Sequence, residues 1–334
     1  MTPGLLNSIE KVERSIQRLK NCGIASGGFQ SGNTCARGGG GGAGSVKTNS
    51  AGEEFHSASR GEDKIWRTAD GKAVPEHIQK LGIPPAWKDV HVNLNAKANT
   101  LATGVDAKGK TQTKYSANHT MKAAANKFGR VSELRKMRKQ ILTEVKQDMK
   151  TGDKRTKEDA AATMLIMKTG MRPGSESDTG ADYKSYGATT LEGRHIVQKS
   201  DGSVVAKFVP GKKKGQEIEM PITDKGLAKE LLKRAKKAGP NGRVFNTTAG
   251  RVRNYSKTKD GGGFKTKDHR TAIGTETAIA AIKSLPMPKT KKEYKASVKA
   301  VSTAVSDVLG NTPSIAFKSY IDPVVFSKWN KVMK

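Results

Sequence analysis

The sequence predicts an α+β protein with a small β-rich N-terminal domain over residues 64–125 and a larger, mainly helical domain over residues 126–334. Two observations lead to this division. Short β-forming runs broken by turn signals such as Asp70-Gly71 fill the first region. From residue 131 to residue 145, apolar side chains then recur at helical spacing.

A three-stranded hairpin sheet is expected inside the helical domain. Its strands are predicted at residues 195–197, 204–208 and 217–220, and Asp201-Gly202 is a hairpin turn between the first two. Residues 211–215 make a looser second turn. This turn places Lys212 at an exposed and movable tip.

Two predicted helices place arginines at their ends. Residues 160–169 form a buried helix that Gly170 stops, so that Arg172 follows just beyond the stop. Residues 271–283 form another helix, which is expected to start directly after Arg270.

The last predicted helix carries a tyrosine. An apolar stripe over residues 298–309 ends at Gly310. Thr312 can then cap a following helix with Pro313 in its first position. Tyr320 is expected about two turns into that helix.

Residues 1–60 are predicted to form a flexible, glycine-rich tail. Residues 38–42 are all glycine, and such a stretch has high chain entropy and few side chains to bury. A tether is the usual role for such a tail, and a partner-binding or localisation role is the alternative. Cys22 and Cys35 both fall in it, which leaves the rest of the chain without a disulfide or a cysteine-based zinc framework.

The charge of the chain favours a nucleic-acid partner. Lysine and arginine number 61 against 31 acidic residues, a net charge of +30. This excess creates a field that concentrates polyanions. An anionic membrane surface would also attract it, but the sequence has neither an apolar run that could span a bilayer nor a signal-type core near Met1. We therefore expect no membrane partner.

The cations upstream of Tyr320 favour a role for it as a nucleophile. A tyrosine phenolate attacks phosphorus only if cations spread the charge on the phosphoryl oxygens and a proton donor reaches the departing oxygen. Arg172, Arg270 and Lys212 could supply these functions. This order of parts indicates strand transfer on DNA.

Five segments, in this order, carry a resemblance to a known family: residues 83–90 (IPPAWKDV), 102–112 (ATGVDAKGKTQ), 185–191 (SYGATTL), 267–271 (KDHRT) and 311–320 (NTPSIAFKSY). Together they resemble the type IB DNA topoisomerases of the poxvirus and bacterial group. The similarity covers roughly residues 64–334.

The resemblance implies a monomeric, C-shaped clamp that closes around double-stranded DNA. In that family the enzyme makes a 3′-phosphotyrosyl link, lets the duplex rotate and reseals it, relaxing positive and negative supercoils without metal, ATP or any other cofactor. It further implies a cytoplasmic location, at a bacterial nucleoid or as a virus-encoded protein in a host cell.

Catalytic roles follow from the resemblance by position. Tyr320 would be the nucleophile, while Arg172 and Arg270 would stabilise the transition state. Lys212 would protonate the leaving 5′ oxygen. The neighbouring Lys213 and Lys214 leave open which lysine of this turn is the acid.

Two further positions match the family pattern, and each also has another explanation. Lys267 fits a second proton-transfer or phosphate-binding lysine, or else a plain basic face. Asn311 stands where poxvirus enzymes have histidine and bacterial ones asparagine, and its amide can donate to a phosphate oxygen. It could equally serve as a helix-terminal asparagine. Pro173, after Arg172, departs from the apolar residue usual in the family.

The β-rich domain offers candidate DNA contacts at Lys108, Lys110, Gln112, Lys114 and Tyr115. The same stretch, residues 104–111, satisfies the nucleotide-loop pattern G-x-x-x-x-G-K-[ST]. Such a loop needs a buried parallel strand before it and a helix after it, whereas residues 111–115 read as a strand. We interpret the stretch as a DNA-facing hairpin turn.

Two other functions are weighed against this reading. A tyrosine recombinase or integrase uses much the same chemistry, but it expects His-x-x-Arg at the second arginine, where this chain has Lys267. A catalytically inactive DNA-binding protein could retain the fold. The nucleophile, arginines and lysine all present in one chain argue against it.

Overall fold

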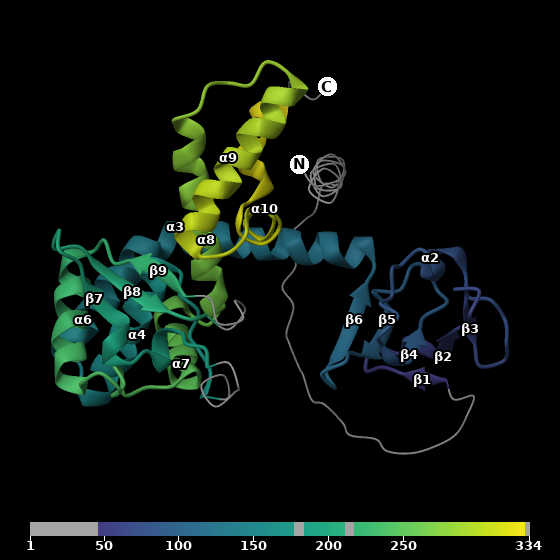
Figure 1. Cartoon of the computed structure of the whole chain (residues 1–334), viewed down its shortest axis with the longest axis horizontal. Helices are drawn as coiled ribbons and strands as arrows, with labels where there is room; N and C mark the ends of the chain where they lie inside the picture. Colours follow the sequence, from purple (N-terminus) through teal and green to yellow (C-terminus); the bar gives the residue numbers. More distant parts are fainter. Residues whose placement is uncertain (1–45, 177–183, 211–216, 331–334) are drawn as a thin grey trace. The chain divides into compact units, whose positions relative to one another are not determined.

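The computed structural model describes residues 46–176, 184–210 and 217–330. The described chain divides into two units, residues 46–126 and residues 127–330, and each has its own hydrophobic core. The division falls within helix α3 (Ala117–Thr151), whose first turns belong to the smaller unit. Figure 1 shows the elements of both units.

The smaller unit is built on an antiparallel sheet of six strands. Its central path runs in the order β1-β2-β4-β5-β6, and β3 pairs with β2. The strands are β1 (Lys47–Thr48), β2 (Glu54–Arg60), β3 (Trp66–Thr68), β4 (Lys88–Val92), β5 (Thr100–Val105) and β6 (Thr111–Tyr115), with one short helix, α2 (Glu76–Gln79). Trp66, Ile78 and Val92 are buried in its core. The predicted α+β fold, with a β-rich unit first, is confirmed.

Strands β1 and β2 correct one boundary, because they lie inside the predicted tail of residues 1–60. His56 pairs with Val92 and Ser57 with His91, so β2 is an interior strand. Phe55 is the only large apolar side chain of β2, and it is buried. The strand is held mainly by backbone pairing on both sides, which a hydrophobic pattern does not reveal. The rest of the predicted tail, residues 1–45, lies outside the described residues.

The turn between β5 and β6 belongs to a hairpin and not to a nucleotide loop. The two strands are antiparallel, with Val105 opposite Thr111. Asp106 Oδ1 accepts from the backbone N–H groups of Lys108 and Lys110, at 2.9 and 3.0 Å. Gly109 has a φ of 71°, as a tight turn requires. Strand β6, and not a helix, follows the turn directly, so the interpretation as a hairpin turn is confirmed. That the turn faces DNA stays a prediction.

The larger unit combines helices with a three-stranded antiparallel sheet in the order β7-β8-β9. Its strands are β7 (Ile196–Gln198), β8 (Val204–Phe208) and β9 (Ile218–Pro221). Its helices are α3, α4 (Lys154–Thr169), α6 (Lys225–Ala238), α7 (Ala249–Asp260), α8 (Thr266–Lys283), α9 (Lys291–Leu309) and α10 (Pro313–Tyr320), with 3-10 turns η1 (Ala188–Thr190), η2 (Gly193–His195) and η3 (Pro323–Phe326). The predicted hairpin sheet is therefore present.

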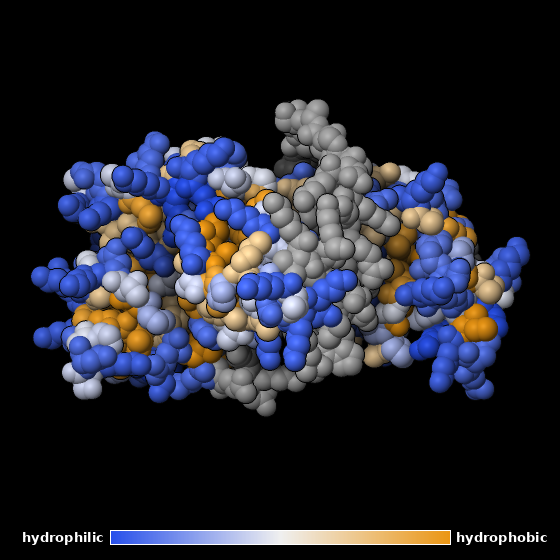
Figure 2. Space-filling view, turned by 90° about the horizontal axis from the view of Figure 1, so that it is seen from above, coloured by the Kyte–Doolittle hydropathy of each residue, from blue (hydrophilic) through white to orange (hydrophobic). Residues whose placement is uncertain are grey.

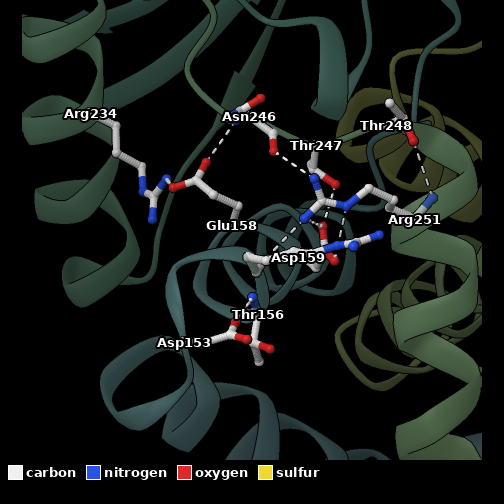
Figure 3. A network of polar contacts seen from close by, with 10 residues as sticks. Asp153, Thr156, Glu158, Asp159, Arg234, Asn246, Thr247, Thr248 and Arg251 are labelled. Atoms are coloured by element: carbon white, nitrogen blue, oxygen red, sulfur yellow. Dashed lines mark hydrogen bonds and ion pairs between the residues drawn. The ribbon is translucent and has the colours of Figure 1, made fainter.

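Helix α4 is fixed by acidic side chains that reach the neighbouring elements, as Figure 3 shows. Glu158 pairs with Arg234 of α6 at 2.6 Å. The buried Asp159 accepts from the Thr247 hydroxyl and pairs with Arg251 of α7 at 3.0 Å. These contacts hold the helix whose C-terminal end leads to Arg172.

Helices α8, α9 and α10 pack side by side around a second core (Figure 1). The apolar stripe of α9 is buried, and Gly310 ends that helix with a φ of 60°, as predicted. Thr312 caps α10, also as predicted. Helix α8 begins earlier than expected, at Thr266, so that Arg270 lies inside it. Asp268 accepts from the Lys265 N–H and so starts the helix, a signal hidden by the polar sequence around it.

The surface of both units is strongly polar. On the face in Figure 2, hydrophilic side chains stand out over most of the surface, with smaller apolar patches between them. Within the described ranges, none of the helices combines the length and apolarity needed to cross a membrane.

Candidate active site

Tyr320 is the last residue of α10, and the helix has a defined start. The Thr312 hydroxyl accepts from the Ile315 N–H at 3.3 Å, and Pro313 occupies the first turn. Ala316 and Phe317 bury one face of this short helix in the core. Tyr320 itself is half-buried.

Two arginines from distant parts of the sequence meet Tyr320. Arg172 Nη2 donates to the Tyr320 hydroxyl at 3.4 Å. The Arg270 guanidinium lies 4.9 Å from the centroid of the Tyr320 ring. The structure thus brings together the three side chains that the sequence analysis placed in one site.

Arg270 is fixed by the ends of two helices. It is only 4% exposed, and it donates through Nη1 to Gly170 O at 2.6 Å and through Nη2 to Leu309 O. These carbonyls lie at the C-terminal ends of α4 and α9, where backbone acceptors lack partners and the helix dipole favours a cation. Its buried Nε has no hydrogen-bond partner among the described residues. Arg270 therefore keeps donor capacity for an anion.

The loop that carries Arg172 is pinned to η1. Arg172 O accepts from Ala188 N at 2.8 Å. Gly174 has a φ of 94°, and a Cβ added to Gly187 would lie 2.5 Å from Gly174 N and 2.6 Å from Arg172 O. The two backbones can approach this closely only because both residues are glycine. Pro173, the departure from the family pattern, is accommodated, since its carbonyl accepts from Thr189 N at 2.7 Å.

The two arginines change the acidity of the nucleophile candidate. Burial alone raises the pKa of Tyr320, but the positive charges of Arg270 and Arg172 outweigh it. The pKa of Tyr320 therefore lies below the ordinary value of a tyrosine. This shift favours the phenolate, which is the form that can attack phosphorus.

Asn311 links α9 to α10, and the polar atoms of its side-chain amide are buried. Its backbone N–H donates to Ser306 O at 3.1 Å, the closing bond of a Schellman turn. Both polar atoms of its side chain are buried without a hydrogen-bond partner among the described residues. A helix-terminal role for the backbone thus leaves the amide able to bind a phosphate oxygen.

A cavity of about 560 Å³ adjoins the arginines. Arg172, Arg253 and Arg270 line it, together with the first residues of α7, and no acidic side chain is among the described residues on its wall. A cavity lined by guanidinium groups suits an anion. Lys267 lies one turn before Arg270 on α8 and is exposed.

Lys212 falls outside the residues that the structure describes, as do Lys213 and Lys214. Pro210, at the near end of that turn, lines the cavity beside Arg172. The role of Lys212 stays a prediction.

The candidate DNA contacts of the smaller unit lie on the β5-β6 hairpin. Lys108 and Lys110 are exposed in its turn, and Lys114 is half-buried on β6. The Gln112 amide donates to Asp106 Oδ2 at 2.8 Å, so this side chain braces the turn. Tyr115 is 51% exposed and stacks on the His119 ring at 4.7 Å between centroids.

Two residues at the site carried no sequence signal. Lys127 of α3 and Thr275 of α8 contact the backbone at the end of α10. Lys127 is one of many lysines in a basic helix. A hydrogen bond to a backbone carbonyl requires no particular sequence motif, so the sequence does not reveal it. Among the described ranges, no group of three or more His, Cys, Asp or Glu side chains could hold a metal ion.

Comparisons with known proteins agree with this geometry. The family model described as eukaryotic DNA topoisomerase I, catalytic core, matches residues 112–332. The model of the bacterial DNA topoisomerase IB N-terminal domain matches residues 66–106. A protein named DNA topoisomerase 1B from Acanthamoeba polyphaga mimivirus is 25% identical over 262 residues, which cover 74% of this chain and 77% of that protein.

Proposed function

The chain belongs to the DNA topoisomerase I family, and we propose that it relaxes supercoiled DNA by nicking one strand through a 3′-phosphotyrosyl link at Tyr320. The observation that carries the proposal is the position of the Tyr320 hydroxyl and ring against Arg172 and Arg270. Attack of the phenolic oxygen on a phosphate would develop negative charge, which nearby cations would stabilise.

In the cleavage step, the deprotonated Tyr320 oxygen attacks the scissile phosphorus. A new P–O bond to the tyrosine forms while the bond to the 5′ oxygen breaks. Arg172 and Arg270 stabilise the charge on the non-bridging oxygens. The Asn311 amide, buried and without a partner among the described residues, donates to one of them. The lowered pKa of Tyr320 supplies more of the reactive phenolate.

The departing 5′ oxygen needs a proton as the bond breaks. We assign this step to Lys212 by its place in the turn between β8 and β9, with Lys267 as a second lysine for proton transfer or phosphate binding. In religation the 5′ hydroxyl attacks the phosphotyrosine, and the lysine takes the proton back. One phosphodiester replaces another of similar energy, so the cycle needs no ATP.

The substrate in this proposal is double-stranded DNA, bound by a monomer that closes around it. The net charge of +30 supports a polyanionic partner. The exposed Lys108 and Lys110 of the β5-β6 turn supply backbone contacts, and Tyr115 offers an exposed ring. While the broken end is free, the duplex rotates and loses supercoils of either sign.

Relaxation of plasmid DNA in EDTA without ATP tests this function. We expect both positively and negatively supercoiled plasmid to give a ladder of topoisomers, and Tyr320→Phe to give none. An absolute requirement for Mg²⁺ or ATP would contradict the proposal.

A further inference from the structure

The nucleophile candidate stands at a weak point of its helix. Helix α10 has eight residues and ends at Tyr320 itself. The last carbonyls of a helix have no partner within it, and so short a helix is marginal without outside support. Tyr320 can therefore be aimed only if other elements hold the end of α10.

Two side chains hold the peptide groups on either side of the Tyr320 Cα. Lys127 Nζ donates to Ser319 O at 3.0 Å, which fixes the preceding peptide. Thr275 Oγ1 donates to Tyr320 O at 3.3 Å and accepts from Asp322 N at 3.2 Å, which fixes the following one. When both flanking peptides are fixed, the direction of the Cα–Cβ bond is fixed as well.

The packing of α8 against Tyr320 leaves little room for another arrangement. A Cβ added to Gly274 would lie 2.7 Å from Tyr320 O and 3.0 Å from Tyr320 Cβ. Thr275, the next residue, is only 1% exposed. The helix that carries Arg270 beneath the tyrosine ring thus also supports the tyrosine backbone.

The surroundings of Lys127 act on its charge in both directions, two favouring the cation and burial opposing it. An ammonium group at the C-terminal end of a helix is stabilised by the helix dipole. The Lys127 Nζ also lies 4.0 Å from the centroid of the Phe128 ring. Burial lowers the pKa of Lys127 and the charge of Lys267 lowers it further, while Asp268, Tyr320 and Asp322 act in the opposite direction.

We propose that Lys127 and Thr275 are positioning residues, which hold the two peptides flanking Tyr320 and so aim its oxygen at the scissile phosphate. The inference rests on the proposed role of Tyr320 as the nucleophile. Neither side chain takes part in the bond changes. Their effect is to limit the orientations that the phenolate can take before attack.

This role has a kinetic signature. Cleavage starts from a free tyrosine that must be aimed, whereas religation starts from a tyrosine already bonded to phosphorus. Loss of a positioning contact should therefore slow cleavage more than religation. Loss of a charge that stabilises the transition state would slow both steps equally.

The test compares Lys127→Met, Lys127→Arg and the control Lys139→Met in single-turnover cleavage and religation. Lys139 is an exposed lysine on the same helix. We expect Lys127→Met to cleave about tenfold more slowly, since a displacement of ~1 Å can cost up to a hundredfold. Religation should change much less, Lys127→Arg should recover most of the rate, and Lys139→Met should match the wild type.

Thr275→Val and Thr275→Ser supply a second, independent pair. Valine keeps the shape but can neither donate to Tyr320 O nor accept from Asp322 N, so it should lower the ratio of cleavage to religation rates, whereas serine should restore it. Equal loss in both rates, no rescue by arginine or serine, or wild-type cleavage by Lys127→Met and Thr275→Val would overturn the inference. If the wild type forms no covalent adduct at all, the proposed function itself fails.

Discussion

At the scale of single residues, Arg172 and Arg270 contact the same tyrosine but are held differently. Arg172 reaches the hydroxyl from a loop, whereas Arg270 is buried and joins the ends of α4 and α9 through two carbonyls. In the proposed mechanism we therefore expect Arg172 to serve mainly the chemistry. We expect Arg270 to serve both the chemistry and the stability of the unit.

Alanine substitutions should separate these contributions. Arg172→Ala and Arg270→Ala should each slow single-turnover cleavage by about a hundredfold or more, the scale of losing one preorganised charge donor. Only Arg270→Ala should also lower the free energy of unfolding, by about 1–3 kcal/mol for each buried carbonyl left without a donor. Denaturant titration and quenched cleavage assays measure the two effects. Near-normal cleavage by either variant would reject its assigned role.

The acidity of Tyr320 gives a prediction for the protein without DNA. Cations stabilise the phenolate, so Tyr320 should lose its proton at a lower pH than an ordinary tyrosine, whose pKa is about 10. The difference between the ultraviolet titrations of wild type and Tyr320→Phe isolates this group. Arg172→Met should move its midpoint to higher pH. A midpoint that does not respond to Arg172 would show that this charge does not act on the phenol.

At the scale of elements, the correct predictions were those of helix ends that depend on short motifs or strong periodicity. Gly170, Thr312 and the stripe of α9 gave correct helix ends, because cap residues and apolar spacing act locally. Strand β2 was missed, since only Phe55 of its side chains is buried and its pairing with β4 joins residues more than 30 positions apart in sequence. Lys127 and Thr275 were missed because they bind backbone carbonyls, which any donor could do.

The corrected boundary of the smaller unit can be tested by two truncations. Removal of residues 1–45 should leave relaxation largely unchanged, since every described strand remains. Removal of residues 1–60 also takes away β1, β2 and the buried Phe55, so the sheet should unfold. Limited proteolysis and plasmid relaxation measure both. An active, protease-resistant protein lacking residues 1–60 would show that β2 is dispensable.

A DNA substrate with a better leaving group tests which lysine protonates the departing 5′ oxygen. Sulfur in the 5′-bridging position departs without a proton, so Lys212→Ala should be severely slowed on normal DNA and largely rescued on a 5′-bridging phosphorothiolate. Lys213→Ala and Lys214→Ala should show small, salt-dependent defects. Rescue of Lys214→Ala instead would move the acid to that residue. No rescue of any of the three would leave Lys267 as the candidate.

At the scale of the whole molecule, the candidate active site is assembled from segments that are distant in sequence. The loop after α4, the α8 helix and the C-terminal α10 converge on Tyr320, and α3 supports its backbone. The net charge of +30 favours a polyanionic partner. The proposed function therefore depends on one event, the transfer of a DNA phosphate to the Tyr320 oxygen.

Mapping of the covalent adduct tests that event most directly. The protein is incubated in EDTA with a nicked DNA duplex whose short 5′-hydroxyl strand diffuses away after cleavage, and the trapped complex is digested and analysed by mass spectrometry. We expect a 3′-phosphate linked to the peptide that contains Tyr320, and no adduct with Tyr320→Phe. An adduct on another residue, or an undiminished adduct with Tyr320→Phe, would contradict it.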